Sequence, residues 1–404
     1  MKALIVTWDA GGVTQPALGL GRQLVARGHD VTTLAPAGLG SRVAGAGGRY
    51  RAWPPSLEFD PRGDRTFEEE WPKVFRNILL GPRLPAAMAT EMGRSAPDVV
   101  IVDFMLRSAL FEAEALGVPA VPLIHMPYRH IGGRDAAEDP DAEWGWRWTY
   151  GRLNEVRARM GLLPLPVGPD NPSVAIARRA PAALVVMPRE FDDWPEPPPS
   201  VRHVGPIFEE SLPVGWESPW RPADPRPLIV VSLGTTAMHQ GEVLARICAA
   251  LAELNARVLL LTGNALDPAD LVLPSGVEVR AFVPHLAVLP EAALLVTHAG
   301  MGTLMAAFAT GVPTVCVPLG RDQATNAQRA LELGASVTVR ADASAPEIAA
   351  VAGRALASFN MRRNAARLRA MVARYDAARL AGDVLEEIAG SAASRARRHP
   401  VAAG

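Results

Sequence analysis

Short apolar segments that alternate with amphipathic helical segments constrain the fold of this chain more than any other feature. Residues 3–7 (ALIVT) form a run suited to a strand buried on both faces, and residues 16–27 place leucines at helical spacing. The same pattern gives further strands at residues 31–34, 99–102, 118–124 and 183–187. Strands separated by single helices predict a parallel sheet that is covered by helices on both faces.

A proline-rich segment, residues 209–227, interrupts this rhythm without any hydrophobic period and is typical of a semi-rigid linker. After it, strands are predicted at residues 228–233, 258–262, 277–281, 294–297 and 314–318, and a helical stretch from residue 346 to about 388. We expect two α/β domains, residues 1–208 and 228–378. Residues 379–404 are expected to end the last helix and to pack back on the first domain.

The number and distribution of charged residues argue against two kinds of partner, nucleic acid and membranes. The chain has 41 Lys and Arg against 42 Asp and Glu, so it lacks the basic excess that binds nucleic acid. Residues 292–320 carry no charged side chain, but glycines and prolines divide them into strand-sized and helix-sized pieces, which predicts buried core rather than a membrane span. No targeting segment opens the chain, and we expect a cytoplasmic protein without a membrane partner.

The strongest local motif is HAGMGT at residues 298–303, between a predicted strand and a predicted helix. A parallel strand that turns through glycines into a helix directs backbone N–H groups and the positive helix end toward one point, and such a point binds phosphate. Gly300 and Gly302 allow close approach of the backbone, and His298 and Thr303 add side-chain donors. The alternative is a tight turn that binds no ligand.

Other polar and aromatic residues follow neighbouring strands of the same half. Ser232 and Thr235 lie in a second glycine turn (SLGTT), and Asp322 and Gln323 follow the strand after the HAGMGT motif. A carboxylate beside an amide suits vicinal hydroxyls such as those of a sugar, although the pair also suits an ordinary helix cap. Phe282 follows another strand, where an aromatic ring either stacks on a base or fills the core. Carboxyl ends of parallel strands converge on one crevice.

On these motifs the second half resembles the donor domain of inverting, nucleotide-sugar-dependent glycosyltransferases. The chain is most similar to the bacterial family-1 enzymes that decorate antibiotics and other natural products. The segments that carry the resemblance are residues 16–31, 97–103, 153–164, 201–206, 232–235, 282–290 and 296–334. The resemblance implies an α/β fold of two Rossmann-like domains that face each other across a cleft, the GT-B architecture. Ala299 departs from it, because glycine is usual there.

The resemblance also implies how a nucleotide-sugar donor is held. Phe282, beside Val283, stacks on the base, and Asp322 and Gln323 hold the sugar hydroxyls with help from Asn326. The diphosphate is held by Ser232, Thr235, His298, Gly300, Gly302 and Thr303. No metal or other cofactor is expected, because a helix dipole and hydrogen-bond donors neutralise the leaving group. The excess of arginine over lysine suggests a GC-rich genome. This makes a TDP-deoxysugar the first donor to consider and a UDP-sugar the second.

The general base departs from the family pattern. The resemblance implies a histidine three residues before Pro16, where this chain has Val13, and an aspartate after a later strand, which matches Asp103. Valine cannot take a proton from an attacking alcohol. The remaining candidates are Asp103, Asp9 and, as a reserve base at the end of a strand, His125.

Three alternatives follow from the missing histidine. In the first, a carboxylate serves as base, with Asp139 and Asp141 of a long loop as further candidates. In the second, the acceptor is acidic or attacks through carbon, so it needs less assistance from a base. In the third, the protein is a non-catalytic or auxiliary homologue that binds a nucleotide sugar without efficient turnover.

Residues 50–85 and 126–172 do not keep the strand–helix rhythm, and they are rich in tryptophan. Such insertions often carry binding specificity, so we expect an aromatic or polyketide-like acceptor there, although the aromatic rings also suit packing beneath the loops. The candidate acceptor-binding residues are Val13, Trp71, Trp144, Trp146 and Trp148.

Two other nucleotide-binding classes are excluded. The turn after the first strand lacks the G-x-G-x-x-G pattern of a dinucleotide-binding oxidoreductase, and no P-loop motif is present. The sequence leaves the oligomeric state open, with a homodimer among the alternatives.

Overall fold

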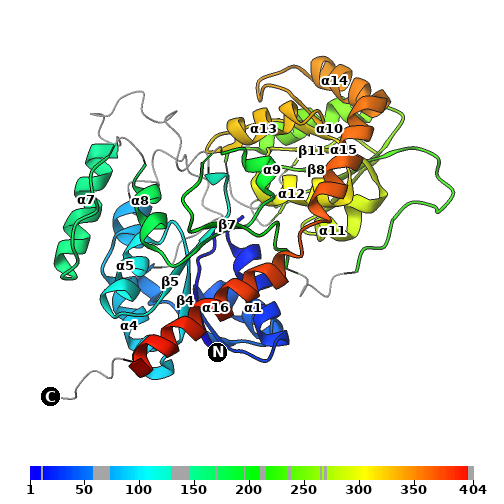
Figure 1. Ribbon diagram of the computed structural model, residues 1–404. Helices are drawn as coiled ribbons and strands as arrows, with labels where there is room; N and C mark the ends of the chain where they lie inside the picture. The colour runs from blue at the N-terminus through cyan, green and yellow to red at the C-terminus, as the bar shows by residue number, and fades with distance from the viewer. Residues whose placement is uncertain are drawn as a thin grey trace. The chain divides into compact units, whose positions relative to one another are not determined.

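The computed structural model describes residues 1–398 except 11, 58–72, 129–145, 169–170, 195, 210–214, 235–237, 264–265 and 268–270. The chain divides into two compact units. Of the described residues, unit 1 contains 1–57, 73–209 and 375–398, and unit 2 contains 215–374. Each unit is built on a parallel sheet (Figure 1).

The sheet of unit 1 has seven strands in the order β3-β2-β1-β4-β5-β6-β7. They are β1 (Lys2–Val6), β2 (Asp30–Ala35), β3 (Arg49–Ala52), β4 (Val99–Asp103), β5 (Ala120–Ile124), β6 (Ala183–Val185) and β7 (Val201–His203). All pairings are parallel. The strand order changes direction between β1 and β4, and ligands of open α/β sheets bind above the carboxyl ends of the strands at such a point.

Helices cover both faces of this sheet. They are α1 (Thr14–Ala26), α2 (Gly40–Gly45), α4 (Arg83–Ser95), α5 (Arg107–Ala115), α7 (Trp146–Arg159), α8 (Pro172–Arg179), α9 (Arg189–Asp192) and α16 (Ala377–Arg398), with short helical segments η1 (Ala37–Leu39), η2 (Pro55–Leu57) and η3 (Phe75–Leu79). The last helix, α16, lies beside α1 (Figure 1). Arg27 Nη2 donates a hydrogen bond of 2.7 Å to Asp383, and Ala381 and Leu385 are buried against the apolar face of unit 1.

Unit 2 repeats the topology with six parallel strands in the order β10-β9-β8-β11-β12-β13. The strands are β8 (Leu228–Ser232), β9 (Arg257–Leu261), β10 (Val277–Arg280), β11 (Ala292–Thr297), β12 (Thr314–Cys316) and β13 (Ser336–Thr338). The helices are α10 (Gly241–Ala252), α11 (His285–Val288), η6 (Leu289–Glu291), α12 (Met301–Thr310), α13 (Gln323–Glu332), α14 (Ala345–Ala357) and α15 (Phe359–Val372). The change of strand direction lies between β8 and β11.

The predicted fold class, two Rossmann-like α/β domains, is confirmed. The uncharged residues 292–320 are divided among β11, α12 and β12, and no helix within the described residues is long and apolar enough to cross a bilayer. Cys248 and Cys316 are both buried, and burial raises the pKa of the Cys248 thiol to about 12.

The structure refines two details of the expected element order. Residues 50–85 were expected to depart from the strand–helix rhythm, and the edge strand β3, which was not predicted, lies at their start. The helical stretch expected from residue 346 to about 388 consists of three helices, and Ser358 ends α14 and caps α15 by accepting a hydrogen bond from the Met361 N–H.

Candidate active site

The start of α12, after the turn that follows β11, presents backbone N–H groups that no side chain caps, whereas the Ala299 N–H within the turn donates to Thr297 Oγ1 at 3.3 Å. Gly300 is the N-cap residue of α12, where no side-chain cap is formed and the first turn carries no acidic residue. The first N–H groups of a helix have no partner within it, and the helix dipole is positive there. No atom from outside the helix lies within 4 Å of the position that a Cβ would take at Gly302. Thr303 is buried in the same turn. This is the geometry of a phosphate site.

The imidazole of His298 fills the space between two glycine turns. A Cβ at Gly300 would overlap His298 Nε2, and a Cβ at Gly234 would lie 2.9 Å from the same atom. Both glycines therefore make room for the ring. Burial lowers the pKa of His298 to about 4 against the opposing charge of Asp322, so the ring is neutral at pH 7. Its Nδ1 is buried without a hydrogen-bond partner among the described residues.

Ser232 ends β8 and pairs in register with Thr297 of β11, which brings the two turns side by side. Its Oγ lies 3.1 Å from Nε2 of His285. Burial lowers the pKa of His285 to about 4, so this ring too is neutral at pH 7. His285 had no predicted role, although it lies in the same segment as Phe282 and Val283 and is separated from Val283 only by Pro284. Its contact with Ser232 depends on how α11 packs, which no local motif reveals.

Three residues around the start of α13 support the HAGMGT turn and the loop beside it. Asn326 is fully buried, and its Nδ2 donates hydrogen bonds to the Ala299 carbonyl at 3.1 Å and to Asp322 at 2.8 Å. Ala299 has a φ of 68°, a left-handed conformation that explains why glycine is usual there. Gln323 Oε1 accepts hydrogen bonds from the N–H groups of Leu319, at 2.7 Å, and Gly320, so this atom shapes the loop.

The two neutral histidines make unit 2 sensitive to acid. An unfolded histidine has a pKa of about 6.5, so between about pH 6.5 and 4 the unfolded chain binds more protons and stability falls as pH falls. We expect His285→Gln, which keeps a donor for Ser232 but does not titrate, to show a smaller fall in melting temperature than the wild type between pH 7 and 4.5. Parallel melting curves for the two proteins would contradict this assignment.

In unit 1, the structure brings together two of the candidate catalytic residues. Asp103 ends β4, His125 follows β5, and His125 Nδ1 lies 3.1 Å from Asp103 Oδ2. The other carboxylate oxygen of Asp103 accepts a hydrogen bond of 3.0 Å from the Met105 N–H. The His125 side chain keeps 14% of its surface exposed, whereas Asp103 is buried at 2%. This distance is that of an ion pair once the ring is protonated, but Nδ1 makes no hydrogen bond among the described residues. A carboxylate beside one ring nitrogen leaves the other nitrogen of the imidazole available for proton transfer.

The other candidates of unit 1 are placed as follows. Val13 is buried at 3% in the apolar cluster that includes Trp8 and Leu106. Asp9 follows β1 at the carboxyl edge of the sheet. Trp148 packs against Phe75 with ring centroids 5.5 Å apart. Trp71, Trp144, Asp139, Asp141 and Thr235 lie outside the described residues, as does the side chain of Trp146 at the start of α7.

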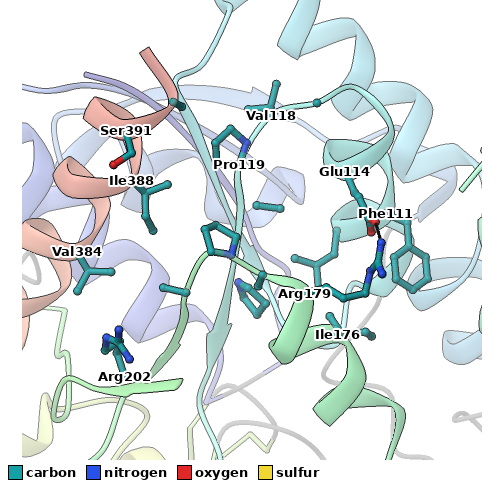
Figure 2. Close-up of a pocket in the computed structure, with 18 of the residues that line it drawn as sticks. Phe111, Glu114, Val118, Pro119, Ile176, Arg179, Arg202, Val384, Ile388 and Ser391 are labelled. Atoms are coloured by element: carbon teal, nitrogen blue, oxygen red, sulfur yellow. Dashed lines mark hydrogen bonds and ion pairs between the residues drawn. The ribbon is translucent and has the colours of Figure 1, made fainter. Parts of the chain in front are cut away.

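A cavity of about 750 Å³ lies in unit 1 at the edge of the sheet where β5 begins, opposite the edge that carries His125. Figure 2 shows Val384, Ile388 and Ser391 of α16 on one side of it and Phe111, Glu114 and Arg179 on the other. Glu114 is already held by Arg157 and Arg179 at 2.6 Å each. Asp9, Asp103 and His125, the candidate catalytic residues that the structure describes, do not line this cavity.

Comparison with known proteins identifies the family. Residues 245–386 match the family described as erythromycin biosynthesis protein CIII-like, C-terminal domain, and residues 10–158 match glycosyltransferase family 4. The demethyllactenocin mycarosyltransferase of Streptomyces fradiae is 30% identical over 95% of this chain and 86% of its own length. The chain belongs to the family-1 natural-product glycosyltransferases.

Other relatives of this glycosyltransferase agree. The oleandomycin glycosyltransferase of Streptomyces antibioticus is 29% identical over 93% of this chain and 88% of its own. The solved calicheamicin glycosyltransferase CalG4 is 25% identical, with a TM-score of 0.77 over 96% of this chain and 98% of its own. The glycosyltransferase predicted from the sequence is therefore confirmed as the enzyme class, with the GT-B fold.

Proposed function

We propose that this glycosyltransferase moves a sugar from a nucleoside diphosphate, TDP or UDP, to the hydroxyl of a small natural-product acceptor with inversion at the anomeric carbon. The observation that carries the proposal is the uncapped N-terminus of α12, with the neutral His298 packed between Gly234 and Gly300. Backbone N–H groups and a neutral imidazole donor suit a diphosphate, whose charge they stabilise without a counter-ion. The acceptors in the relatives' names, oleandomycin and demethyllactenocin, favour an antibiotic aglycone.

The base in this proposal is His125, oriented by Asp103. Its free ring nitrogen takes the proton of the acceptor hydroxyl as the oxygen attacks the anomeric carbon, and the bond from that carbon to the β-phosphate oxygen breaks. The nucleoside diphosphate leaves with both electrons of that bond, and the proton passes from His125 to solvent. A single displacement of this kind inverts the anomeric configuration. Asp103 stabilises the imidazolium that forms, as the carboxylate of a Ser-His-Asp triad does.

Donor specificity tests the proposal directly. Calorimetry with TDP, UDP, ADP and GDP identifies the nucleotide, and mass spectrometry of the enzyme with the matching donor and a library of phenolic and macrolide acceptors identifies the product. We expect one pyrimidine nucleotide to bind and a glycoside to form with inverted configuration by NMR. Binding without any transfer or donor hydrolysis would contradict the enzymatic part of the proposal.

We further propose that transfer needs no divalent cation, because the first turn of α12 and His298 supply the donors that stabilise the leaving diphosphate. We expect activity to stay within about twofold after dialysis against EDTA and to remain unchanged when Mg²⁺ or Mn²⁺ is returned. A loss that either metal restores would show that the protein groups are insufficient.

A further inference from the structure

The hydroxyl of Ser232 has a hydrogen-bond partner within the protein, but the direction of its proton is open. Ser232 is buried at the carboxyl end of β8, and among the described residues its Oγ makes a single hydrogen bond, 3.1 Å from His285 Nε2. A hydroxyl has one proton, whereas a nitrogen of a neutral imidazole either donates or accepts. Ser232 therefore either donates to His285 or accepts from it, and only in the second case can its own proton reach a ligand.

Three elements of unit 2 meet at this hydroxyl. Val231 and Leu233 belong to the apolar cluster that includes α10 and α14, and because side chains alternate along a strand, Ser232 faces the other side of the sheet. On that side α11, which begins with His285, packs against α12. Thr297, the register partner of Ser232, comes immediately before the HAGMGT turn. The Ser232 hydroxyl thus lies beside the turn at which the diphosphate is proposed to bind.

An anion at this turn would select between the two directions of the hydrogen bond. The His285 ring is neutral at pH 7, so it carries one proton, on either nitrogen. Phosphate oxygens only accept hydrogen bonds, so they hold the Ser232 hydroxyl as a donor and leave its oxygen free to accept from a protonated Nε2. Hydrogen bonds in such a chain polarise one another, and the chain binds an anion more strongly than an isolated hydroxyl does.

We propose that His285 is a positioning residue for the donor: its Nε2–H donates to Ser232 Oγ, and the Ser232 hydroxyl donates to an oxygen of the donor diphosphate. This relay rests on the proposed function, since it assigns the diphosphate to unit 2. It adds to the donor site a residue outside the HAGMGT and SLGTT motifs, which acts through Ser232 and not through contact with the nucleotide. The competing explanation is that the hydrogen bond only anchors α11 to β8.

A double-mutant cycle on nucleotide binding tests the relay. Calorimetry measures the affinity for TDP or UDP, whichever the wild type binds more tightly, and for the matching nucleoside. We expect Ser232→Ala to weaken the nucleotide by about tenfold and His285→Phe by about five- to tenfold. The double variant should lose no more than Ser232→Ala alone, because His285 acts through Ser232. Nucleoside affinity should change by less than about twofold in all three variants, because the nucleoside has no phosphate to accept from Ser232.

Two further variants serve as controls. His285→Gln keeps a side-chain N–H for Ser232 and should bind nucleotide within about threefold of the wild type. Ser336→Ala also removes a buried hydroxyl, which lies 3.1 Å from Cys316 Sγ, but Ser336 begins β13 and so lies at the amino edge of the same sheet. It should leave nucleotide affinity unchanged. Melting curves for every variant show that affinities are compared between folded proteins.

The position of the proton on His285 gives a readout that a merely structural role would not fix. In protein with isotope-labelled histidine, NMR resolves which ring nitrogen is protonated, and the His285 signals are assigned by their loss in His285→Gln. With saturating nucleotide we expect the proton on Nε2. A proton on Nδ1 would leave Nε2 to accept from Ser232 and would overturn the relay, whether or not His285→Phe folds.

Each remaining outcome also decides the question. Additive losses in the cycle, or equal losses of nucleotide and nucleoside in His285→Phe, would show that the hydrogen bond only anchors α11. Normal nucleotide affinity in Ser232→Ala would contradict the relay as well. If the cycle and the tautomer agree with the relay but no donor yields product, the proposed function fails while the relay stands. A wild type that binds neither nucleotide overturns both.

Discussion

Replacing His125 by alanine is expected to lower kcat by about 10²- to 10⁴-fold, the usual contribution of a general base. The acceptor hydroxyl would then have to lose its proton to water. Donor affinity should stay within about twofold, because His125 belongs to unit 1 and the proposed diphosphate site belongs to unit 2. Steady-state kinetics at saturating donor, together with nucleotide calorimetry, measure both quantities.

The acceptor's acidity gives this prediction a second readout. A phenol of low pKa is already ionised at neutral pH and needs no base, so His125→Ala should harm it least, and the activity of the variant should rise with pH toward the pKa of the acceptor. Asp103→Asn should likewise lower activity least for acidic phenols, because the amide no longer stabilises the imidazolium. Equal losses for acidic and weakly acidic acceptors would argue against a role in proton transfer.

His29 supplies the matched control. Its Nε2 lies 2.8 Å from Glu386 Oε1, so it is also a histidine held by a carboxylate in unit 1. It precedes β2 and therefore lies at the amino edge of the sheet, opposite His125. His29→Ala should leave kcat unchanged within about twofold. If His125→Ala retains full activity, the base is another group, with Asp9 the next candidate.

The main strands were predictable because strands that are buried on both faces have continuous apolar sequences. All residues of β4 and β8 are buried, and both strands were predicted within one residue of their ends. β3 was missed because its sequence, RYRA, is polar and half exposed at a sheet edge. β7 and β13 are only three residues long, too short for any hydrophobic period to register.

The site was only partly predictable from the sequence, for a related reason. The glycine turn at residues 298–303 is local, so its chemistry can be read from adjacent residues. The pairing of His125 with Asp103 instead depends on β4 and β5 being neighbours in register, with Asp103 opposite Leu123.

Val13 shows what a family pattern alone leaves open. The missing histidine at this position left several alternatives: a carboxylate base, His125 as a reserve base, an acceptor that needs less help, or a non-catalytic homologue. The side chain of residue 13 instead packs in an apolar cluster, where an imidazole would be buried without a partner. Asp103 lies 3.1 Å from His125, so in the proposed mechanism the orienting carboxylate is retained and the histidine is the residue after β5 rather than one at the start of α1.

Gly302→Val is expected to abolish measurable donor binding, a loss of about 100-fold or more, while the protein stays folded. Residue 302 lies in the first turn of α12, its φ is not positive, and a Cβ there would meet no atom from outside the helix within 4 Å. Valine therefore fits the protein and forms helix better than glycine. Its methyl groups would stand in front of the N–H groups proposed to hold the diphosphate. The loss of two or three charge-assisted hydrogen bonds accounts for the expected magnitude.

Calorimetry with TDP and UDP, beside thermal melting, separates this steric effect from unfolding. Gly353→Val is the matched control, since Gly353 lies in α14 of the same unit and its Cβ would make only an ordinary contact, 3.8 Å from Leu254. The control should bind nucleotide as the wild type does. Gly302→Ala should give an intermediate loss, because one methyl group obstructs less than three carbons. Normal nucleotide affinity in a folded Gly302→Val protein would show that the diphosphate does not bind at the start of α12. It would also contradict the roles proposed for His298 and Ser232.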